Sequence, residues 1–440
     1  MSRFHPIAAA IVVAASIYAC VAHASETLPL VERPALLALA VQSHPAVRAA
    51  DQRASAMRRS GVAEGTLPPP EAMVQIWQVP IARPYAVGDA QMIMFGVGQT
   101  FPAPGSQSAR RRAAEHEAEA EQALGTDAAR RVRLQMDHAF ADYVEATSRH
   151  RVHIDHRAVA ARTVEIARAR HAGGGSLADL AQADVELARM DADVITDGTR
   201  VDAARGRINA LLGRDVLAPL GGPAMNAPAI AEWDVRAAID KAHASRPELR
   251  ASVALRDARR EEARASEREA VIPSFSVAAL YFSPTSVLPQ HGYGANATMT
   301  LPWLWNEARS RRDARNDLAA AMESERAATL RSIDAEVAAQ EAMVRASGLR
   351  LQTLRDRALP AAHRAFEVVW AGFETSRIPT LTVLAARRAV VDIESELVAA
   401  RATLDHALAD LDAAVGVEVP RRALGARAST SDHEGATHGD

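Results

Sequence analysis

The stretch GYGANATMTLP, residues 292–302, alternates strictly between apolar and small or polar side chains. Its apolar positions are Tyr293, Ala295, Ala297, Met299 and Leu301. Its small or polar positions are Gly294, Asn296, Thr298 and Thr300. A period of two predicts a β-strand with one apolar face. Residues 274–282 alternate in the same way, and the proline- and glycine-rich segment between the two windows predicts a connecting loop.

The surroundings of these strands occur twice in the chain. The landmarks that return in the same order are His44-Pro45-Ala46 as Arg246-Pro247-Glu248, Leu67-Pro68 as Ile272-Pro273, Thr100-Phe101-Pro102 as Thr300-Leu301-Pro302, and Ala109-Arg110 as Ala308-Arg309. An ordered set of this kind indicates an internal duplication. We therefore expect two repeats, residues 25–222 and 223–418. The first repeat should carry matching strands at about 72–79 and 90–101.

Long helices are predicted after each strand pair. Residues 105–218 contain no proline, and alanine, glutamate, arginine and leucine recur at helical spacing up to a glycine-rich break at 172–176. This pattern predicts a helical hairpin over about 106–217. The second repeat predicts another hairpin over about 307–415, with its turn near 373–379. Pro360 lies inside the first arm of that hairpin and predicts a kink.

Both ends of the chain are expected to lie outside this fold. Arg3, an apolar run over 7–19 and the small-x-small site Ala22-His23-Ala24 have the layout of a secretory signal peptide, residues 1–24. Lipidation of Cys20, which follows a poor lipobox, is the alternative to cleavage after Ala24. Residues 419–440 are predicted to be a disordered tail, most clearly the polar and acidic part from 426 onward.

Composition and motifs exclude several functional classes. The chain has 440 residues with 51 basic and 54 acidic side chains, and the net charge of −3 provides no field that would attract nucleic acid. One cysteine excludes a disulfide scaffold and a cysteine-built metal site. The sequence contains no phosphate-binding loop, nucleophile elbow or dinucleotide fingerprint. We therefore predict no enzymatic activity, no catalytic residues and no cofactor.

The strand windows are rich in aromatic residues and follow an export signal. Of the 18 aromatic residues, 10 lie within 71–105 and 271–305. Strands with one apolar face and flanking aromatics are typical of a transmembrane β-barrel wall, although the core of a β-sandwich shows the same alternation. The strands predicted for one chain are too few to complete either structure. Three copies would supply twelve strands, so a symmetric trimer is the simplest way to close a barrel.

The repeated order of helix, strand pair and long helical hairpin resembles the TolC-like outer-membrane efflux factor family over nearly the whole mature chain. The resemblance implies a mainly α protein with a transmembrane β-barrel part, in which a trimeric, twelve-stranded barrel continues as a periplasmic α-helical barrel. It also implies residence in the outer membrane of a Gram-negative bacterium and contact with outer-membrane lipid. Its implied partners are a periplasmic adaptor protein and an inner-membrane pump.

The transported substrate is less clearly indicated. Residues 98–105, GQTFPAPG, lead into Arg110, Arg111 and Arg112, and this sequence motif resembles the heavy-metal efflux branch of the family. The resemblance therefore implies a passive exit duct for heavy-metal cations. An outer-membrane channel for drug efflux or type I protein secretion fits the same residues. A soluble periplasmic coiled-coil adaptor or scaffold is an alternative of another class, but it leaves the apolar face at 293–301 unexplained.

The resemblance places the turns of the two hairpins, 172–180 and 373–384, at the periplasmic tip, where the channel is gated and adaptors dock. The tip candidates are Gly173, Ser176, Asp179, Ser376 and Arg377. Three copies of Asp179 would form an acidic ring that favours cations. Alternatively, residues 176–179 read as a capping box at the start of the return helix.

Two clusters of basic or metal-ligating side chains allow alternative interpretations. His150, His153 and His156 lie on adjoining turns of one predicted helix and are weak candidates for a metal site. A solvated helix face is the favoured explanation for them. Arginines follow both strand windows, at 110–112 and at 309, 311 and 312. They could contact lipid phosphates, or they could form ion pairs with Glu115, Glu117 and Asp313.

Overall fold

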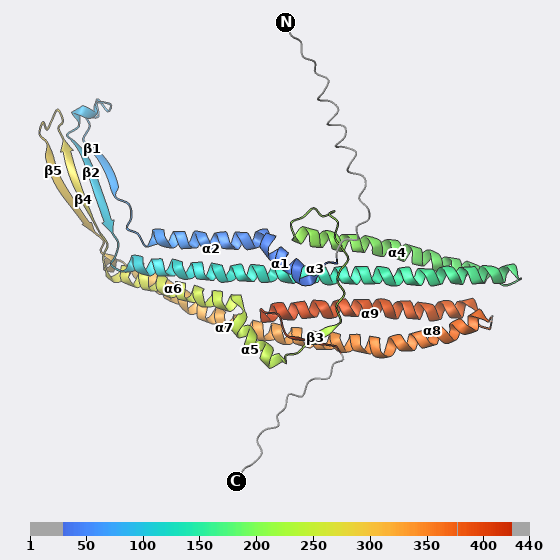
Figure 1. Ribbon diagram of the computed structural model, residues 1–440. Coiled ribbons are helices and arrows are strands. Elements are labelled where there is room, and N and C mark those ends of the chain that lie inside the picture. The colour runs from blue at the N-terminus through green and yellow to red at the C-terminus, as the bar shows by residue number, and fades with distance from the viewer. Residues whose placement is uncertain (1–29, 376, 425–440) are drawn as a thin grey trace, which may run out of the picture. The chain divides into compact units, whose positions relative to one another are not determined.

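The computed structural model describes residues 30–375 and 377–424, and these residues form a mainly helical chain with one larger sheet (Figure 1). They divide into two units. The hairpin unit contains residues 30–39, 139–227 and 358–402, and the sheet unit contains residues 40–138, 228–357 and 403–424. The predicted signal peptide with Cys20, the tip residue Ser376 and the tail from 425 onward lie outside the described residues.

The larger sheet of the sheet unit contains four antiparallel strands in the order β1-β2-β4-β5 (Figure 1). The strands are β1 (Glu71–Trp77), β2 (Met92–Phe101), β4 (Phe275–Ser283) and β5 (Gly292–Met299). Each sequence repeat contributes one hairpin, and β2 pairs with β4 to join them. This sheet is open, with β1 and β5 at its edges.

Strand β5 is shorter than the alternation predicts. The Thr300 N–H still donates to the Ser274 carbonyl at 2.9 Å, but the ladder ends there. Pro302, which has no N–H for a ladder, begins the short 3₁₀ helix η3 (Pro302–Leu304). Leu301, predicted as a strand residue, therefore lies between the strand and η3.

Helices make up most of the sheet unit outside its strands. They are α2 (Pro45–Glu64), the first part of α3 (Ser106–Ala172), α5 (Val235–Ser245), α6 (Pro247–Val271) and α7 (Glu307–Thr353). Asp234 caps α5 by accepting from the Ala237 N–H at 2.8 Å. Pro45 and Pro247 begin α2 and α6, where a missing N–H costs nothing. Small buried side chains such as Ala120, Ala251 and Ala254 allow these helices to pack closely.

The C-terminal segment of the sheet unit corrects one boundary of the predicted tail. Residues Arg421–Ala423 form β6, which pairs with β3 (Ala229–Ala231) in a two-stranded sheet. Val419 is buried, and its N–H donates to an Asp412 carboxylate oxygen at 2.8 Å. Residues 419–424 are therefore ordered, because backbone pairing and a buried valine hold them in place.

Two helical hairpins make up most of the hairpin unit. The first contains the end of α3 and α4 (Leu177–Leu211), and the second contains α8 (Leu359–Glu374) and the start of α9 (Thr380–Val415). A π-helical turn, η4 (Leu354–Ala358), directly precedes α8, in which Pro360 is the second residue. The short helix α1 (Arg33–Ser43) leads into the fold.

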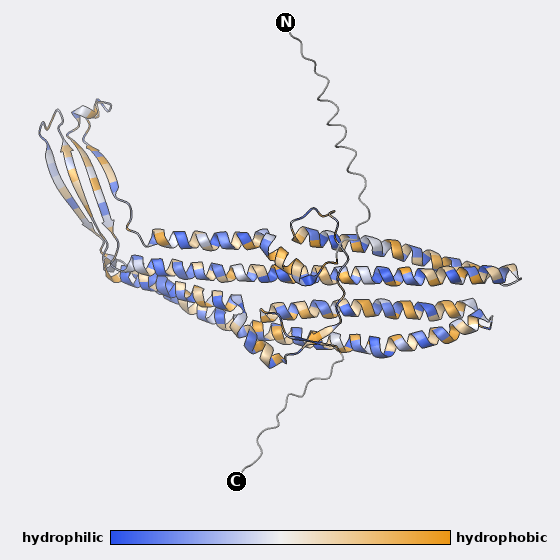
Figure 2. Ribbon diagram, in the orientation of Figure 1, coloured by the Kyte–Doolittle hydropathy of each residue, from blue (hydrophilic) through white to orange (hydrophobic). Residues whose placement is uncertain are grey.

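Hydrophilic and hydrophobic residues are interspersed along the long helices (Figure 2). No helix in the described residues combines the length and apolarity needed to cross a bilayer.

Candidate channel wall and hairpin tips

One face of the four-stranded sheet is apolar across all four strands. Directly opposed residues of an antiparallel pair lie on the same face, so the register assigns every side chain to one of two faces. The apolar face, as we call it, contains Ala72, Val74, Ile76, Ile93, Phe95, Val97, Gln99, Phe101, Phe275, Val277, Ala279, Tyr281, Ser283, Tyr293, Ala295, Ala297 and Met299. Gln99 and Ser283 are its polar members.

The apolar face is exposed on one chain. The side chains of Tyr293, Val74 and Val97 are 85%, 62% and 60% exposed. Exposing a large apolar surface of this kind to water is unfavourable. Aromatic rings pack across the strands on this face: Phe101 stacks on Phe275 with ring centres 5.0 Å apart. The apolar face therefore has no covering layer among the described residues.

The opposite face, which we call the second face, has a different character along its length. Near the helices it carries small or polar side chains: Glu71, Gly98, Thr100, Ser276, Ala278, Asn296 and Thr298. Near the strand-connecting loops it carries one polar side chain, Gln75, and larger apolar side chains: Met73, Trp77, Met92, Met94, Leu280 and Phe282. Glycines make room for them. A Cβ at Gly294 would lie 2.8 Å from the Phe282 ring, so only glycine fits there.

The turn of the first hairpin is built on glycine. Gly174 has φ +92°, and the Gly175 N–H donates to the Arg170 carbonyl at 2.9 Å. Such a left-handed residue after a helix is most easily supplied by glycine. Gly173 and Ser176 flank this turn and are exposed.

Asp179 does not take part in the predicted capping box. Ser176 is the N-cap residue of α4, but its hydroxyl makes no capping hydrogen bond, so that prediction is wrong. An Asp179 carboxylate oxygen instead accepts a hydrogen bond from the hydroxyl of Thr380 at 2.8 Å. Thr380 is fully buried at the first residue of α9. The contact therefore joins the tips of the two hairpins.

A second contact between the tips was not predicted from the sequence. The guanidinium of Arg170 lies over the Phe373 ring, 4.0 Å from its centre, and donates to the Phe373 carbonyl. Phe373 is fully buried with Val383 and Leu384, and partly buried aromatic and aliphatic side chains surround it. Arg377, a predicted tip residue, is exposed beside this cluster. The available signal was the helical spacing of Phe366, Trp370 and Phe373, far from the aromatic-rich strand windows.

Two of the three predicted histidines bind different partners. The Nδ1 of His153 lies 2.6 Å from an Asp197 carboxylate oxygen, and the Nε2 of His156 lies 2.9 Å from one of Glu394. The Nδ1 of His150 is buried without a hydrogen-bond partner. Among the described residues, no three histidine, cysteine or acidic side chains are grouped to hold a metal ion.

Glu394 connects both hairpins through two histidines. Its carboxylate lies 2.9 Å from the Nε2 of His156 on α3 and 3.2 Å from the Nε2 of His363 on α8. The hydrogen bond from His156 lowers the pKa of Glu394, and the charges of both histidines add to this effect. Glu186 on α4 makes a further link by pairing with Arg388 of α9 at 2.6 Å.

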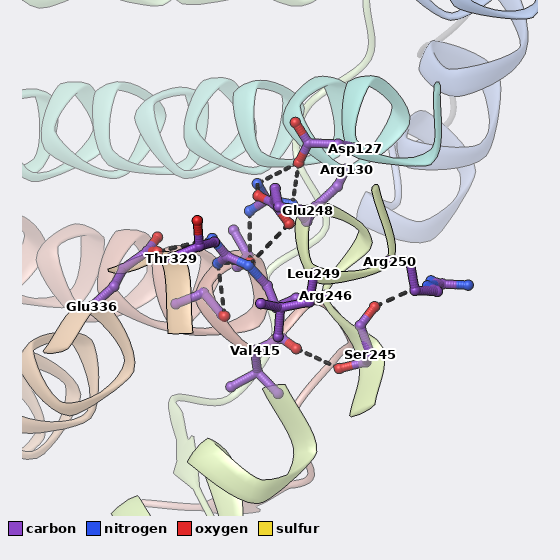
Figure 3. A network of polar contacts seen from close by, with 12 residues as sticks. Asp127, Arg130, Ser245, Arg246, Glu248, Leu249, Arg250, Thr329, Glu336 and Val415 are labelled. Atoms are coloured by element: carbon purple, nitrogen blue, oxygen red, sulfur yellow. Dashed lines mark hydrogen bonds and ion pairs between the residues drawn. The ribbon is translucent and has the colours of Figure 1, made fainter. Parts of the chain in front are cut away.

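A buried ionic network holds the sheet unit together near the C-terminus of α9 (Figure 3). Arg130 of α3 donates to Asp127 at 2.5 Å, to Glu248 at 2.7 Å and to the Ala413 carbonyl at 2.6 Å. Arg246 donates to the Ala414 carbonyl at 2.8 Å and to Glu336 at 3.0 Å. Burial alone would raise the pKa of Asp127, but Arg130 outweighs it and the pKa is lowered.

The arginines that follow the strands form ion pairs. Arg110 pairs with Glu269 at 2.6 Å, and Arg112 with the largely buried Glu261 at 2.9 Å. The predicted pairs Arg111–Glu115 and Arg312–Asp313 are confirmed, at 2.9 and 2.8 Å. The predicted partner Glu117 instead binds Arg259.

With the fold and sites described, the chain can be compared with known proteins. Residues 238–417 match the model of the outer membrane efflux protein family. The resemblance to TolC-like outer-membrane efflux factors is thereby confirmed. Comparison with curated proteins gives no match.

Solved structures of outer-membrane channels share the fold. VceC of Vibrio cholerae is 16% identical with a TM-score of 0.71, covering 88% of this chain and 96% of its own. The CmeC outer membrane channel of Campylobacter jejuni is 15% identical with a TM-score of 0.72, covering 88% of this chain and 86% of its own. CusC, whose crystal structures concern folding and transmembrane channel formation, is 14% identical with a TM-score of 0.73, covering 89% of this chain and 93% of its own.

Proposed function

We propose that the protein is the outer-membrane channel of a tripartite efflux pump, in which three copies form a passive exit duct across the outer membrane and periplasm. The apolar face of the sheet carries this proposal. It spans four strands, includes exposed Val74, Val97 and Tyr293, and is interrupted mainly by Gln99. A lipid environment removes the cost of exposing such a surface.

The edges of the sheet support the trimer. The outward-facing backbone groups of the edge strands β1 and β5 have no strand partner among the described residues. In a bilayer, unpaired backbone groups cost several kcal/mol each. If β5 of one copy pairs with β1 of the next, three copies close a twelve-stranded barrel without free edges. The hairpin tips then gather around the axis, where an adaptor and, through it, an inner-membrane pump would bind.

The proposed substrate class is heavy-metal cations. The sequence motif at 98–105 and 110–112, which resembles the heavy-metal efflux branch, supports this proposal. A channel for drugs or secreted proteins would use the same wall, because substrate choice then resides in the pump. Export assays with the partner pump separate these alternatives.

Membrane fractionation followed by native mass measurement in detergent tests location and stoichiometry together. We expect the processed chain in the outer-membrane fraction as a trimer that requires detergent. A monomer released by osmotic shock without detergent would refute the channel and favour the soluble periplasmic scaffold. A substitution on the second face, Asn296→Ala, should leave the trimer yield equal to that of the unmodified chain.

A further inference from the structure

The two β-hairpins of the larger sheet repeat one arrangement. The landmarks that occur twice in the sequence place β5 200 residues after β2, and β4 205 residues after β1. The strand registers give the same offsets independently. Glu71 lies opposite Gly98 in the first hairpin, and the residues that correspond to them, Ser276 and Thr298, lie opposite each other in the second. The repeat therefore extends to the pairing of individual backbone positions.

The junction between the two hairpins of one chain can serve as a template for a junction between two chains. Within the chain, β2 pairs with β4, and Gly96 lies opposite Leu280. The same offsets relate Gly96 to Asn296 of β5, and Leu280 to Gln75 of β1. If β5 of one copy meets β1 of the next copy as β2 meets β4, Asn296 lies opposite the next copy's Gln75.

This register joins the apolar face of one copy to the apolar face of the next. It places Ala295 opposite Ile76 and Ala297 opposite Val74, and all four residues belong to the apolar face. A slip by one residue would turn the apolar side chains of one strand toward the second face of its neighbour. The side chains thus agree with a register that was derived from the offsets alone.

The second face separates this register from a slip by two residues. Asn296 and Gln75 are both exposed, and their amides can donate to and accept from each other. Gly294, which has no side chain, lies opposite the bulky Trp77 in this register. A slip by two residues would instead place the Asn296 amide opposite Met73 or Trp77. The backbone ladder holds the strands together, and these side chains select its register.

The helices next to the two free edges carry a matching pair of charges. Arg110 of α3 pairs with Glu269 of α6 at 2.6 Å within the chain. The corresponding residues are Arg309 of α7, which follows β5, and Glu64 of α2, which precedes β1. Both are exposed, and neither has an ion pair in the part of the chain that the structure describes. The repeat therefore assigns each of them a partner on another copy.

We infer that β5 and α7 of one copy dock on β1 and α2 of the next, with Asn296 opposite Gln75 in the strand ladder and an ion pair between Arg309 and Glu64. The inference rests on the proposed function for the closure by three copies, and it names the residues through which the copies recognise one another. The occupant of each free edge is a second copy of this chain, because the junction between copies then repeats the junction within one chain.

Disulfide cross-linking of the full chain in outer membranes tests the register. Opposed residues of an antiparallel pair have Cα atoms about 4.5–5.5 Å apart, within reach of a disulfide. We expect Asn296→Cys with Gln75→Cys, and Ala297→Cys with Val74→Cys, to give covalent trimers on non-reducing gels that disappear on reduction. Neighbouring pairs alternate between hydrogen-bonded and non-hydrogen-bonded geometry, so the two double variants sample both. Each single variant controls for Cys20, the one cysteine of the chain.

Two further double variants test a slipped register. They combine Asn296→Cys with Met73→Cys or with Trp77→Cys, which in the inferred register are diagonal neighbours about 7–8 Å away. We expect at least fivefold less covalent trimer from these pairs than from Asn296→Cys with Gln75→Cys. Cross-linking mainly through Met73→Cys or Trp77→Cys would overturn the inferred register.

Charge reversal tests the helix contact. Arg309→Glu places two carboxylates at the junction and should lower the trimer yield at least twofold, whereas Arg309→Glu combined with Glu64→Arg should restore it. A yield that the second substitution does not restore would refute the ion pair. Native mass and membrane location are measured on the same preparations. A membrane trimer without cross-links in the inferred register would refute the contact and leave the channel standing, whereas a monomer released without detergent would refute the channel and the contact with it.

Discussion

An arginine on the apolar face should block membrane assembly, and the adjacent residue provides the control. Ala295 is near the middle of β5 on the apolar face, whereas Asn296 is on the second face, and both side chains are exposed. If the apolar face meets lipid, Ala295→Arg places a cation at mid-depth, at a cost of about 2–4 kcal/mol per chain. This corresponds to a roughly 30- to 700-fold shift against the inserted state. Asn296→Arg faces the lumen and should cost little.

Depth determines the size of the effect. Met299, the last residue of β5, lies four residues from Ala295. With a rise of about 3.4 Å per residue and a strand tilt of about 40°, this places Met299 about 10 Å from mid-depth, close to the rim of the apolar band. Met299→Arg should therefore impair assembly much less, by about 0–1 kcal/mol. The assay is the yield of detergent-extracted trimer from outer membranes. Equal losses for Ala295→Arg and Asn296→Arg would refute the assignment of faces.

Further predictions concern the helices. Asp127→Asn should lower the free energy of unfolding by about 3 kcal/mol in urea titrations, because it removes one partner of a buried ion pair while Glu248 remains bound to Arg130. The pKa of Asp127 is lowered in the folded chain, so the stabilisation by its carboxylate is fully present above the ordinary pKa of 3.8 and is lost as the pH falls through the lowered folded pKa. The free energies of unfolding of the unmodified chain and of this variant should therefore converge at low pH. Asp179→Asn keeps an acceptor for Thr380 but removes the charge, so raised resting conductance or weaker cation preference in planar bilayers would demonstrate an acidic ring, and unchanged currents would leave Asp179 a structural role.

The parts of the fold that follow from local patterns could be predicted from the sequence. Alternation over 292–299 and 274–282 is a property of neighbouring residues, and the proline-free runs rich in alanine do not depend on distant contacts. The ends of elements were less predictable. Pro302 turned the end of the β5 window into η3, and Arg421–Ala423 became a strand only because Ala229–Ala231 lies beside it. A three-residue strand has no pattern of its own.

The contacts at the candidate sites could not be predicted, since they join repeats that are far apart in the chain. Asp179 and Thr380 lie in the first turns of different helices, and nothing near either residue specifies the other. The buried network offered one signal. Arg246 occupies the position that His44 holds in the first repeat, and it pairs locally with Glu248 at 3.1 Å. Its distant partners, the α9 carbonyls and Glu336, became apparent only once the chain was folded.

The tip contacts limit how a gate could work in this chain. One carboxylate oxygen of Asp179 is already bound to buried Thr380, and Arg170 is held by the ring and carbonyl of Phe373. The two hairpins of one chain are therefore joined by a hydrogen bond and by a cation–π contact at their tips. Separating them would leave the buried Thr380 hydroxyl unpaired and would expose Phe373, each at a cost of about 1–3 kcal/mol. Opening that moves both hairpins as one body avoids these costs, so the motion that widens a tip should occur mainly between copies of the chain. Cross-linking residue 179 to residue 380 after Asp179→Cys and Thr380→Cys should then leave opening intact, whereas abolished opening would show that the hairpins must part.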